Sequence, residues 1–283
     1  MNKYKHQLLT QNKIFLCINI TQRCNLNCRY CNAFANLTKY TKDLLLDYDY
    51  NQFEKDIEHI KKTCNIGSIS FYGSEFFVNK NWKKFIVKTR ELFNCQIDLF
   101  TNGIKLVNLK DYNILIDNNI KVVYTKYPLN EPLKTNIDNA VKFLKSKGLN
   151  ISLPYDPEKI NPTISLKTLF TVPRFYKTRY SAITAHKLCA CDAISMFNGK
   201  IFTCNINNNI NILNNVYNYN YKQNYILVEN IKSNLDLIKF SKMHSELCQY
   251  CYQTEKISNT SIQREWSLEI PSKNDYSIQK SEL

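Results

Sequence analysis

Short apolar runs of strand length alternate with stretches of helical periodicity through residues 13–155, and this alternation constrains the fold more than any other feature. Alternating strands and helices build βαβ units, in which helices cover a mainly parallel sheet. We therefore expect an α/β fold, with Asp47 as the N-cap of the first helix and Gly148 as the stop of the last. The predicted strands are 13–20, 67–73, 96–103, 120–125 and 150–155, and the predicted helices are 47–63, 79–93, 108–119 and 133–148.

Three loops with polar or ligating residues each follow a predicted strand directly. They are "TQRCNLNCRYCNAF" (21–34), "YGSE" (72–75) and "TNG" (101–103). In parallel sheets of this kind, ligand sites lie at the carboxyl ends of the strands. We therefore expect these three loops, which are far apart in the sequence, to meet at one edge of the sheet.

The first of these loops carries three cysteines, Cys24, Cys28 and Cys31, in the spacing C-x3-C-x2-C. Three thiolates on one short loop can hold three irons of a cubane [4Fe–4S] cluster and leave the fourth iron without a protein ligand. An open coordination position is typical of a reactive metal site. The alternative is a zinc knuckle with a fourth ligand elsewhere in the chain, although C-x3-C is not the usual zinc spacing.

The three loops together resemble the radical S-adenosylmethionine (radical SAM) superfamily over residues 13–125. The C-x3-C-x-aromatic-C motif follows the first strand, "FYGSE" is similar to the glycine–glycine–glutamate stretch of that family, and "FTNG" is similar to its Thr-Asn-Gly ending of the third strand. The resemblance implies a partial (β/α)6 TIM-like barrel that binds a [4Fe–4S] cluster and S-adenosylmethionine (SAM). It also implies that one electron from the cluster cleaves SAM to a 5′-deoxyadenosyl radical, which abstracts a hydrogen atom from the substrate.

The same resemblance implies roles for five residues that bind the cofactor. Tyr30 would cover the adenine, and Asn102 would contact the cofactor. Gly73, Ser74 and Glu75 would meet the methionyl amine, because glycine permits a close backbone approach and a carboxylate suits an ammonium. Ser74 departs from the second glycine of the family and still offers backbone and hydroxyl groups.

A second group of cysteines lies in the C-terminal third of the chain. The Asn-Gly pair at 198–199 predicts a tight hairpin, whose second strand leads to the last cysteine of a G-x4-C unit. A C-x2-C pair follows some forty residues later. The group resembles the shortened auxiliary-cluster (twitch or SPASM-like) region of radical SAM enzymes, which implies a second [4Fe–4S] cluster; a structural four-cysteine zinc site is the alternative. The cysteines are Cys189, Cys191, Cys204, Cys248 and Cys251.

Five cysteines for four ligand positions leave one of Cys189 and Cys191 spare. The sequence leaves open which of them is the ligand. The spare thiol could return a hydrogen atom to a substrate radical, as a radical epimerase requires, or it could be an inert buried cysteine.

Composition narrows the class of protein. The chain has eleven cysteines and no N-terminal apolar segment typical of an export signal, so we expect a cytoplasmic protein whose cysteines bind metal rather than form disulfides. The net charge of +14 accompanies a general excess of Lys, Asn, Ile and Tyr and does not by itself favour nucleic acid. No apolar run is long enough for a membrane span. The Asn-biased segment 205–224 is interpreted as a loop without function.

We divide the chain into a radical SAM barrel (1–180), an auxiliary-cluster region (181–270) and a polar tail (271–283). The expected activity is radical chemistry, either epimerisation or oxidation, on a small metabolite such as a sugar or nucleotide-linked sugar. The expected electron donor is a flavodoxin or ferredoxin, and the oligomeric state stays open. The alternatives are a radical SAM enzyme that modifies peptides and a non-catalytic iron–sulfur or zinc protein.

Overall fold

The computed structural model describes residues 12–29, 31–127, 129–153, 180–189 and 194–251. Among the helices of these segments, none is long and apolar enough to cross a membrane. The strands are β1 (Ile14–Ile18), β2 (Ile66–Phe71), β3 (Gln96–Thr101), β4 (Lys121–Tyr124), β5 (Ile151–Ser152), β6 (Ile194–Phe197), β7 (Lys200–Phe202) and β8 (Tyr225–Leu227). The α-helices are α2 (Tyr50–Thr63), α3 (Trp82–Leu92), α4 (Asn113–Asp117), α5 (Leu133–Ser146), α7 (Ala182–Leu188), α8 (Asn205–Tyr217) and α9 (Asn234–Ser241). The 3-10 helices are η1 (Ala35–Tyr40), η2 (Phe76–Val78), η3 (Ile104–Asn108), η4 (Val228–Asn230) and η5 (Glu246–Tyr250).

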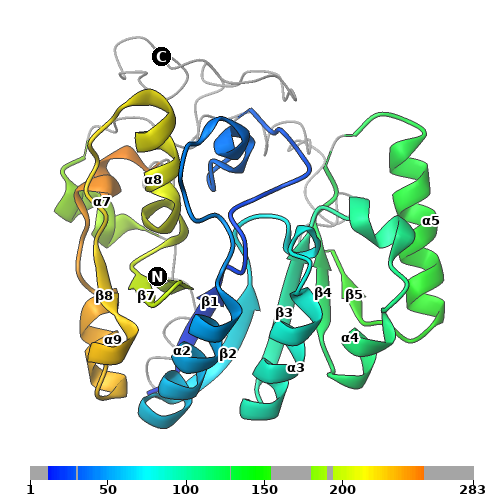
Figure 1. The fold of residues 1–283 in the computed structure, drawn as a ribbon, viewed down its shortest axis with the longest axis horizontal. Coiled ribbons are helices and arrows are strands. Elements are labelled where there is room, and N and C mark those ends of the chain that lie inside the picture. The colour runs from blue at the N-terminus through cyan, green and yellow to red at the C-terminus, as the bar shows by residue number, and fades with distance from the viewer. Residues whose placement is uncertain (1–11, 30, 128, 154–179, 190–193, 252–283) are drawn as a thin grey trace.

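The eight strands within the described segments belong to one sheet in the order β5-β4-β3-β2-β1-β6-β7-β8. The pairs from β5 to β6 are parallel, and β7 and β8 add antiparallel strands at one edge. Helices α2 and α3 lie side by side in front of the parallel strands (Figure 1). The expected α/β class with an open, mainly parallel sheet is confirmed.

Helix α2 shows how the sequence pattern places a helix on the sheet. Phe53, Ile57 and Ile60 recur at helical spacing and are fully buried in the main core. The N-cap is Asp49, whose side chain accepts a hydrogen bond from the backbone N–H of Gln52. The expectation that Asp47 caps this helix is therefore wrong, because the helix begins at Tyr50, too far along the chain for that carboxylate to cap it.

The predicted hairpin is present as β6 and β7. Asn198 and Gly199 have φ values of 43° and 75°, and a two-residue type I′ turn needs positive φ at both of its central positions. The hairpin continues the main sheet, since β6 pairs with β1 in parallel. Cys204 follows β7 and is the N-cap of α8.

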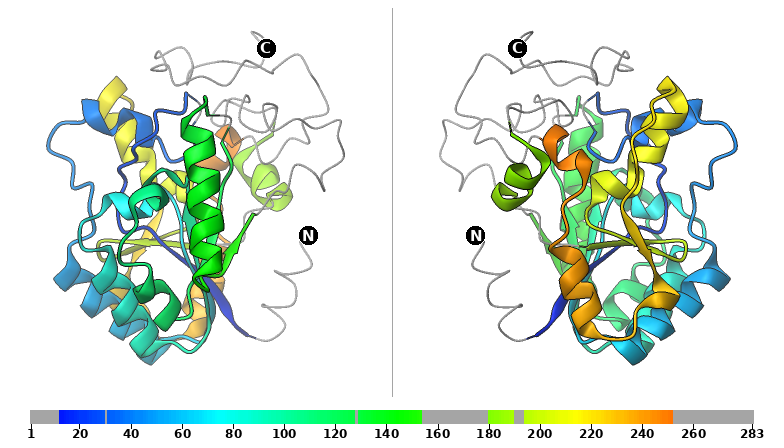
Figure 2. Two further views of the ribbon diagram at one scale, coloured as in Figure 1. Left: turned by 90° about the vertical axis from the view of Figure 1, so that its right-hand side faces the viewer. Right: turned by 90° about the vertical axis from the view of Figure 1, so that its left-hand side faces the viewer.

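The Asn-biased segment is not a loop, and our expectation for it is wrong over residues 205–217, which form α8. Its apolar residues Ile206, Ile210 and Leu213 recur at helical spacing and pack into a second core with Phe34 and Leu37 of the cysteine loop and η1. Helix α8 and η1 lie next to each other at the top of the views in Figures 1 and 2. This contact brings the C-terminal third of the chain against the first cysteine loop.

Candidate metal and cofactor site

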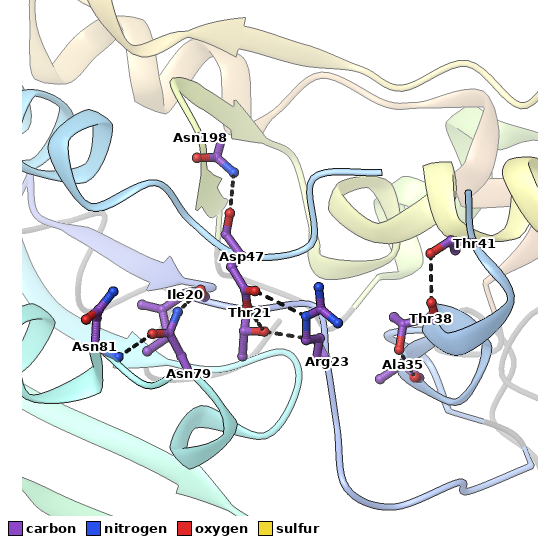
Figure 3. Close-up of polar contacts among 10 residues, drawn as sticks. All are labelled: Ile20, Thr21, Arg23, Ala35, Thr38, Thr41, Asp47, Asn79, Asn81 and Asn198. Carbon is purple, nitrogen blue, oxygen red and sulfur yellow. Dashed lines mark hydrogen bonds and ion pairs between the residues drawn. The ribbon is translucent and has the colours of Figure 1, made fainter. Parts of the chain in front are cut away.

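The first cysteine loop begins at the carboxyl end of β1 and is tied down at its start by Asp47. Asp47 Oδ1 accepts a hydrogen bond from Thr21 Oγ1 at 2.6 Å, and Asp47 Oδ2 forms an ion pair with Arg23 Nε at 3.1 Å (Figure 3). Asn198, in the hairpin turn, donates to the Asp47 carbonyl at 3.2 Å. The residue expected to cap a helix therefore joins the cysteine loop to the β6–β7 hairpin.

The thiols of the loop lie close enough to influence one another. Burial raises the pKa of the Cys24 thiol above its usual range, and the charges of Glu75, Cys31 and Cys28 raise it further. The backbone N–H of Leu26 donates to Cys24 Sγ at 3.3 Å. Clustered thiolates repel one another unless metal ions neutralise them, so the chemistry of this donor set fits a metal cluster.

The arrangement of the three thiols is compatible with a cubane cluster. Among the residues that the structure describes, no three His, Cys, Asp or Glu side chains are gathered as a single metal ion requires. A cubane does not need such convergence, because each of its thiolates binds a different iron. Three thiols on one short loop therefore match the donor set of a [4Fe–4S] cluster.

Glu75 links all three loops at this edge of the sheet. Its N–H donates to the carbonyl of Arg23 in the cysteine loop at 3.0 Å. Its carboxylate accepts hydrogen bonds from Thr101 Oγ1 and the Asn102 N–H, both at 2.9 Å, and from the Phe77 N–H at 3.3 Å. Burial raises the pKa of Glu75 to about 7, although these hydrogen bonds pull it down. The expected meeting of the three loops is thus present in the structure.

The backbone at Gly73 is closely packed against neighbouring side chains. Its φ is 140°, and an added Cβ would lie 2.8 Å from Asn19 Nδ2 and 3.1 Å from Asn205 Oδ1. Next to it, Ser74 Oγ is buried and has no hydrogen-bond partner among the described residues. The loop therefore combines a close-packed backbone with a hydroxyl group that a ligand could use.

Asn102 reaches from the β3 loop to the first cysteine loop. Its Nδ2 donates to Asn25 Oδ1 at 2.8 Å and lies 3.6 Å from Cys24 Sγ. Its Oδ1 accepts the Ile104 N–H at 3.0 Å. The side chain expected to contact the cofactor is thus directed at Cys24, one of the three cysteines expected to bind the cluster.

Sequence reasoning missed the buried amides of α8. Asn208 and Asn209 are fully buried; Asn209 Oδ1 accepts from Asn19 Nδ2 at 3.4 Å, and the Asn208 carbonyl accepts from Gln22 Nε2 at 3.3 Å. Gln22 Oε1, Asn208 Oδ1 and Asn205 Nδ2 are buried without a hydrogen-bond partner among the described residues. The apolar residues between the asparagines recur at helical spacing, and this spacing was the sequence signal for the helix.

Tyr127, just after β4, was also missed. Burial raises the pKa of its hydroxyl well above the usual range, and the thiols of Cys28 and Cys31 add to this effect. An ordinary "KYP" stretch in the sequence offers no signal for such a position. Tyr127 therefore joins the residues around the first cysteine loop.

The second cysteine group comes together from three elements. Cys189 ends α7, Cys204 precedes α8, Cys248 lies in η5 and Cys251 follows η5. Burial raises the pKa of the Cys204 thiol to about 12, with further contributions from Cys248 and Cys189. His186 Nδ1 lies 3.9 Å from Cys248 Sγ. Cys251 belongs to the second core, and Cys204 packs against it.

Two residues of the expected site, Tyr30 and Cys191, lie outside the described residues. The others fall into two groups that share α8. Cys24, Cys28, Cys31, Gly73, Ser74, Glu75 and Asn102 surround the carboxyl ends of β1, β2 and β3, and Cys189, Cys204, Cys248 and Cys251 lie around the start of α8.

An open, mainly parallel α/β sheet with a three-cysteine loop at the carboxyl end of its first strand is the architecture of a cluster-binding partial barrel. Residues 18–127 match the model of the Radical SAM superfamily. The chain therefore contains a radical SAM domain, for which a [4Fe–4S] cluster and SAM are the implied cofactors.

Comparisons with individual proteins give one sequence relative and two structures of similar fold. A 7,8-dihydro-6-hydroxymethylpterin dimethyltransferase of Methanocaldococcus jannaschii is 30% identical over 111 residues, which are 39% of this chain and 21% of that protein. The structure of BtrN in complex with AdoMet and 2-DOIA superposes with a TM-score of 0.50 and 16% identity, covering 94% of this chain and 98% of BtrN. Native anSMEcpe with bound AdoMet gives a TM-score of 0.54 and 12% identity over 88% and 93% of the two chains. At these identities the two structures show a shared fold.

Proposed function

We propose that this protein is a radical SAM enzyme whose cluster is held by Cys24, Cys28 and Cys31. The observation that carries the proposal is the meeting of the three thiols with the Glu75-linked loops at one edge of the sheet. When bound, the cluster supplies the electron that cleaves SAM to a 5′-deoxyadenosyl radical. The chain's own residues hold the three loops in fixed positions relative to one another, so that the proposed ligands and cofactor contacts keep a fixed geometry.

The test is anaerobic reconstitution with iron and sulfide, reduction with dithionite, addition of SAM and measurement of 5′-deoxyadenosine. Cys24→Ala should abolish the product, whereas Cys64→Ala should keep it, because Cys64 is half-buried and packs against the main core away from the loop. A wild-type protein that takes up iron and yields no 5′-deoxyadenosine would favour a non-catalytic protein. S-adenosylhomocysteine as the product would point instead to methyl transfer, the chemistry in the name of the archaeal relative.

The methionyl end of SAM is proposed to lie against Gly73 and Ser74, with Asn205 beside them. Support comes from Ser74 Oγ and Asn205 Nδ2, which are buried polar atoms without partners among the described residues. Such atoms cost stability unless a ligand or water satisfies them. Asn205→Ala should weaken SAM binding about tenfold, or about 1.4 kcal/mol. Asn215→Ala, on the exposed side of the same helix, is the matched control, and equal affinities for the two variants would refute this contact.

A second [4Fe–4S] cluster is proposed at Cys189, Cys204, Cys248 and Cys251. The mutual effects of Cys189, Cys204 and Cys248 on pKa support the set. Cys191 is then the spare thiol proposed as a hydrogen-atom donor. Metal analysis separates iron from zinc at this site, and Cys191→Ala tests the donor role: if its product still acquires deuterium from D2O at the wild-type rate, the role is refuted.

The proposed substrate is a small polar metabolite such as a sugar or nucleotide-linked sugar, acted on by epimerisation or oxidation. Gln22 Oε1 and Asn208 Oδ1 support it, because they are buried amide oxygens without a partner among the described residues, and such oxygens accept hydrogen bonds from hydroxyl groups without adding charge. A flavodoxin or ferredoxin would supply electrons. Deuterated sugars and peptides should be compared for transfer of deuterium to 5′-deoxyadenosine, and transfer from peptides alone would favour peptide modification.

A further inference from the structure

The orientation of the Asn102 amide is decided by its neighbours. The Ile104 N–H can only donate, so the atom that it meets at 3.0 Å must be the oxygen Oδ1. The NH2 group then faces the other way, where it donates to Asn25 Oδ1 and meets Cys24 Sγ at 3.6 Å. An exchanged amide would place two donors against each other at Ile104. The N–H group is therefore directed at the sulfur.

The turn that carries Asn102 has little freedom to move. Glu75 Oε2 accepts the Asn102 N–H at 2.9 Å, and Thr101 Oγ1 accepts the Gly103 N–H at 3.1 Å. Gly103 has a φ of 84°, and an added Cβ would lie 2.5 Å from the ring of Tyr124. A buried carboxylate on one side and a packed ring on the other thus fix the position of the amide.

The sulfur of Cys24 also has a second N–H group, that of Leu26, at 3.3 Å. Hydrogen bonds to the thiolate ligands of an iron–sulfur cluster help set its reduction potential. They stabilise negative charge on sulfur, and the reduced cluster carries one more negative charge than the oxidised cluster. Each such hydrogen bond therefore favours the reduced form.

We propose that Asn102 is a positioning residue that donates an N–H···S hydrogen bond to Cys24 and thereby raises the reduction potential of the SAM-binding cluster. Glu75 keeps the amide in place through the Asn102 backbone. The inference rests on the proposed function, because it requires that Cys24 binds the cluster. In this role Asn102 acts on the cluster through Cys24, and it does not need to contact SAM.

The experiment is a dye-mediated redox titration of the reconstituted enzyme, followed by the EPR signal that changes when SAM is added. Asn102→Ala should lower the ratio of reduced to oxidised cluster roughly tenfold at a fixed potential, a 59 mV negative shift for a one-electron couple. Asn79→Ala is the matched control, because Asn79 is a buried asparagine at the same edge whose side chain bonds to backbone groups. It donates to the Ile20 carbonyl and accepts from the Asn81 N–H, both at 2.8 Å. An unchanged potential in Asn102→Ala, or equal shifts in both variants, would overturn the inference.

A measurement on the wild type covers the case in which Asn102→Ala loses its iron. Side-chain 15N-labelled asparagine should give a nitrogen coupling to the reduced cluster in pulsed EPR, and the absence of this coupling would overturn the inference. A different result refutes the proposed function itself: a wild-type protein that forms no [4Fe–4S] cluster at all.

Discussion

Replacing Gly73 by alanine tests the close packing between the "YGSE" loop and its neighbours. At a φ of 140° an L-residue is strained, at a cost of about 1–3 kcal/mol. The new methyl group would also lie 2.8 Å from Asn19 Nδ2 and 3.1 Å from Asn205 Oδ1. Asn19 is buried and bonded to Asn209, so it cannot turn away freely, and overpacking costs about 1–3 kcal/mol more. We expect Gly73→Ala to lose roughly 2–6 kcal/mol in the free energy of unfolding.

The matched control is Gly148→Ala. Gly148 also has a positive φ, 94°, but an added Cβ there meets nothing within 4 Å, so only backbone strain remains. Urea denaturation of both variants, followed by circular dichroism, gives the two free energies when the slopes with denaturant agree. If Gly73→Ala is no less stable than Gly148→Ala, the packing argument is refuted.

Three further outcomes follow from the buried groups. Burial raises the pKa of Glu75 from 4.5 to about 7, so the folded state holds a proton that the unfolded state releases between these values. Stability from this group should thus fall by about 3 kcal/mol as the pH rises from 4.5 to 7, and Glu75→Gln should flatten that slope in chemical denaturation of the metal-free protein. Phe53→Ala, which removes a fully buried ring 4.6 Å from that of Phe85, should lose about 3–5 kcal/mol in the same assay. Cys204→Ser should lose about half of the bound iron by colorimetric analysis, as expected for one of two [4Fe–4S] clusters, while Cys64→Ser should keep all of it.

The residue types of the candidate site can be recognised from local sequence, whereas the hydrogen bonds that join its loops depend on the tertiary structure. The cysteine spacing and the polar residues after each strand can be recognised along the chain, because parallel strands bring their carboxyl ends together. The position of Glu75 between Thr101 and Asn102 cannot be recognised in the same way. It depends on the pairing of β2 with β3 and on where the chain turns after each strand.

The Asn-biased segment shows how composition misleads. Asparagine favours turns and caps in isolation, so the segment was interpreted as a loop. Packing of Ile206, Ile210 and Leu213 against the cysteine loop overrides that preference, and α8 forms with its amides buried.

The sequence by itself determined the order of strands and helices, the parallel sheet, the Asn-Gly hairpin and the cysteine-rich loop after the first strand, because each depends on periodicity or short-range spacing. Only the tertiary structure decided that Asp47 holds the cysteine loop, that α8 lies beside Gly73 and that Asn102 points at Cys24. These contacts join residues 26 to 132 positions apart, and which side chains meet across such separations depends on how the elements pack in three dimensions.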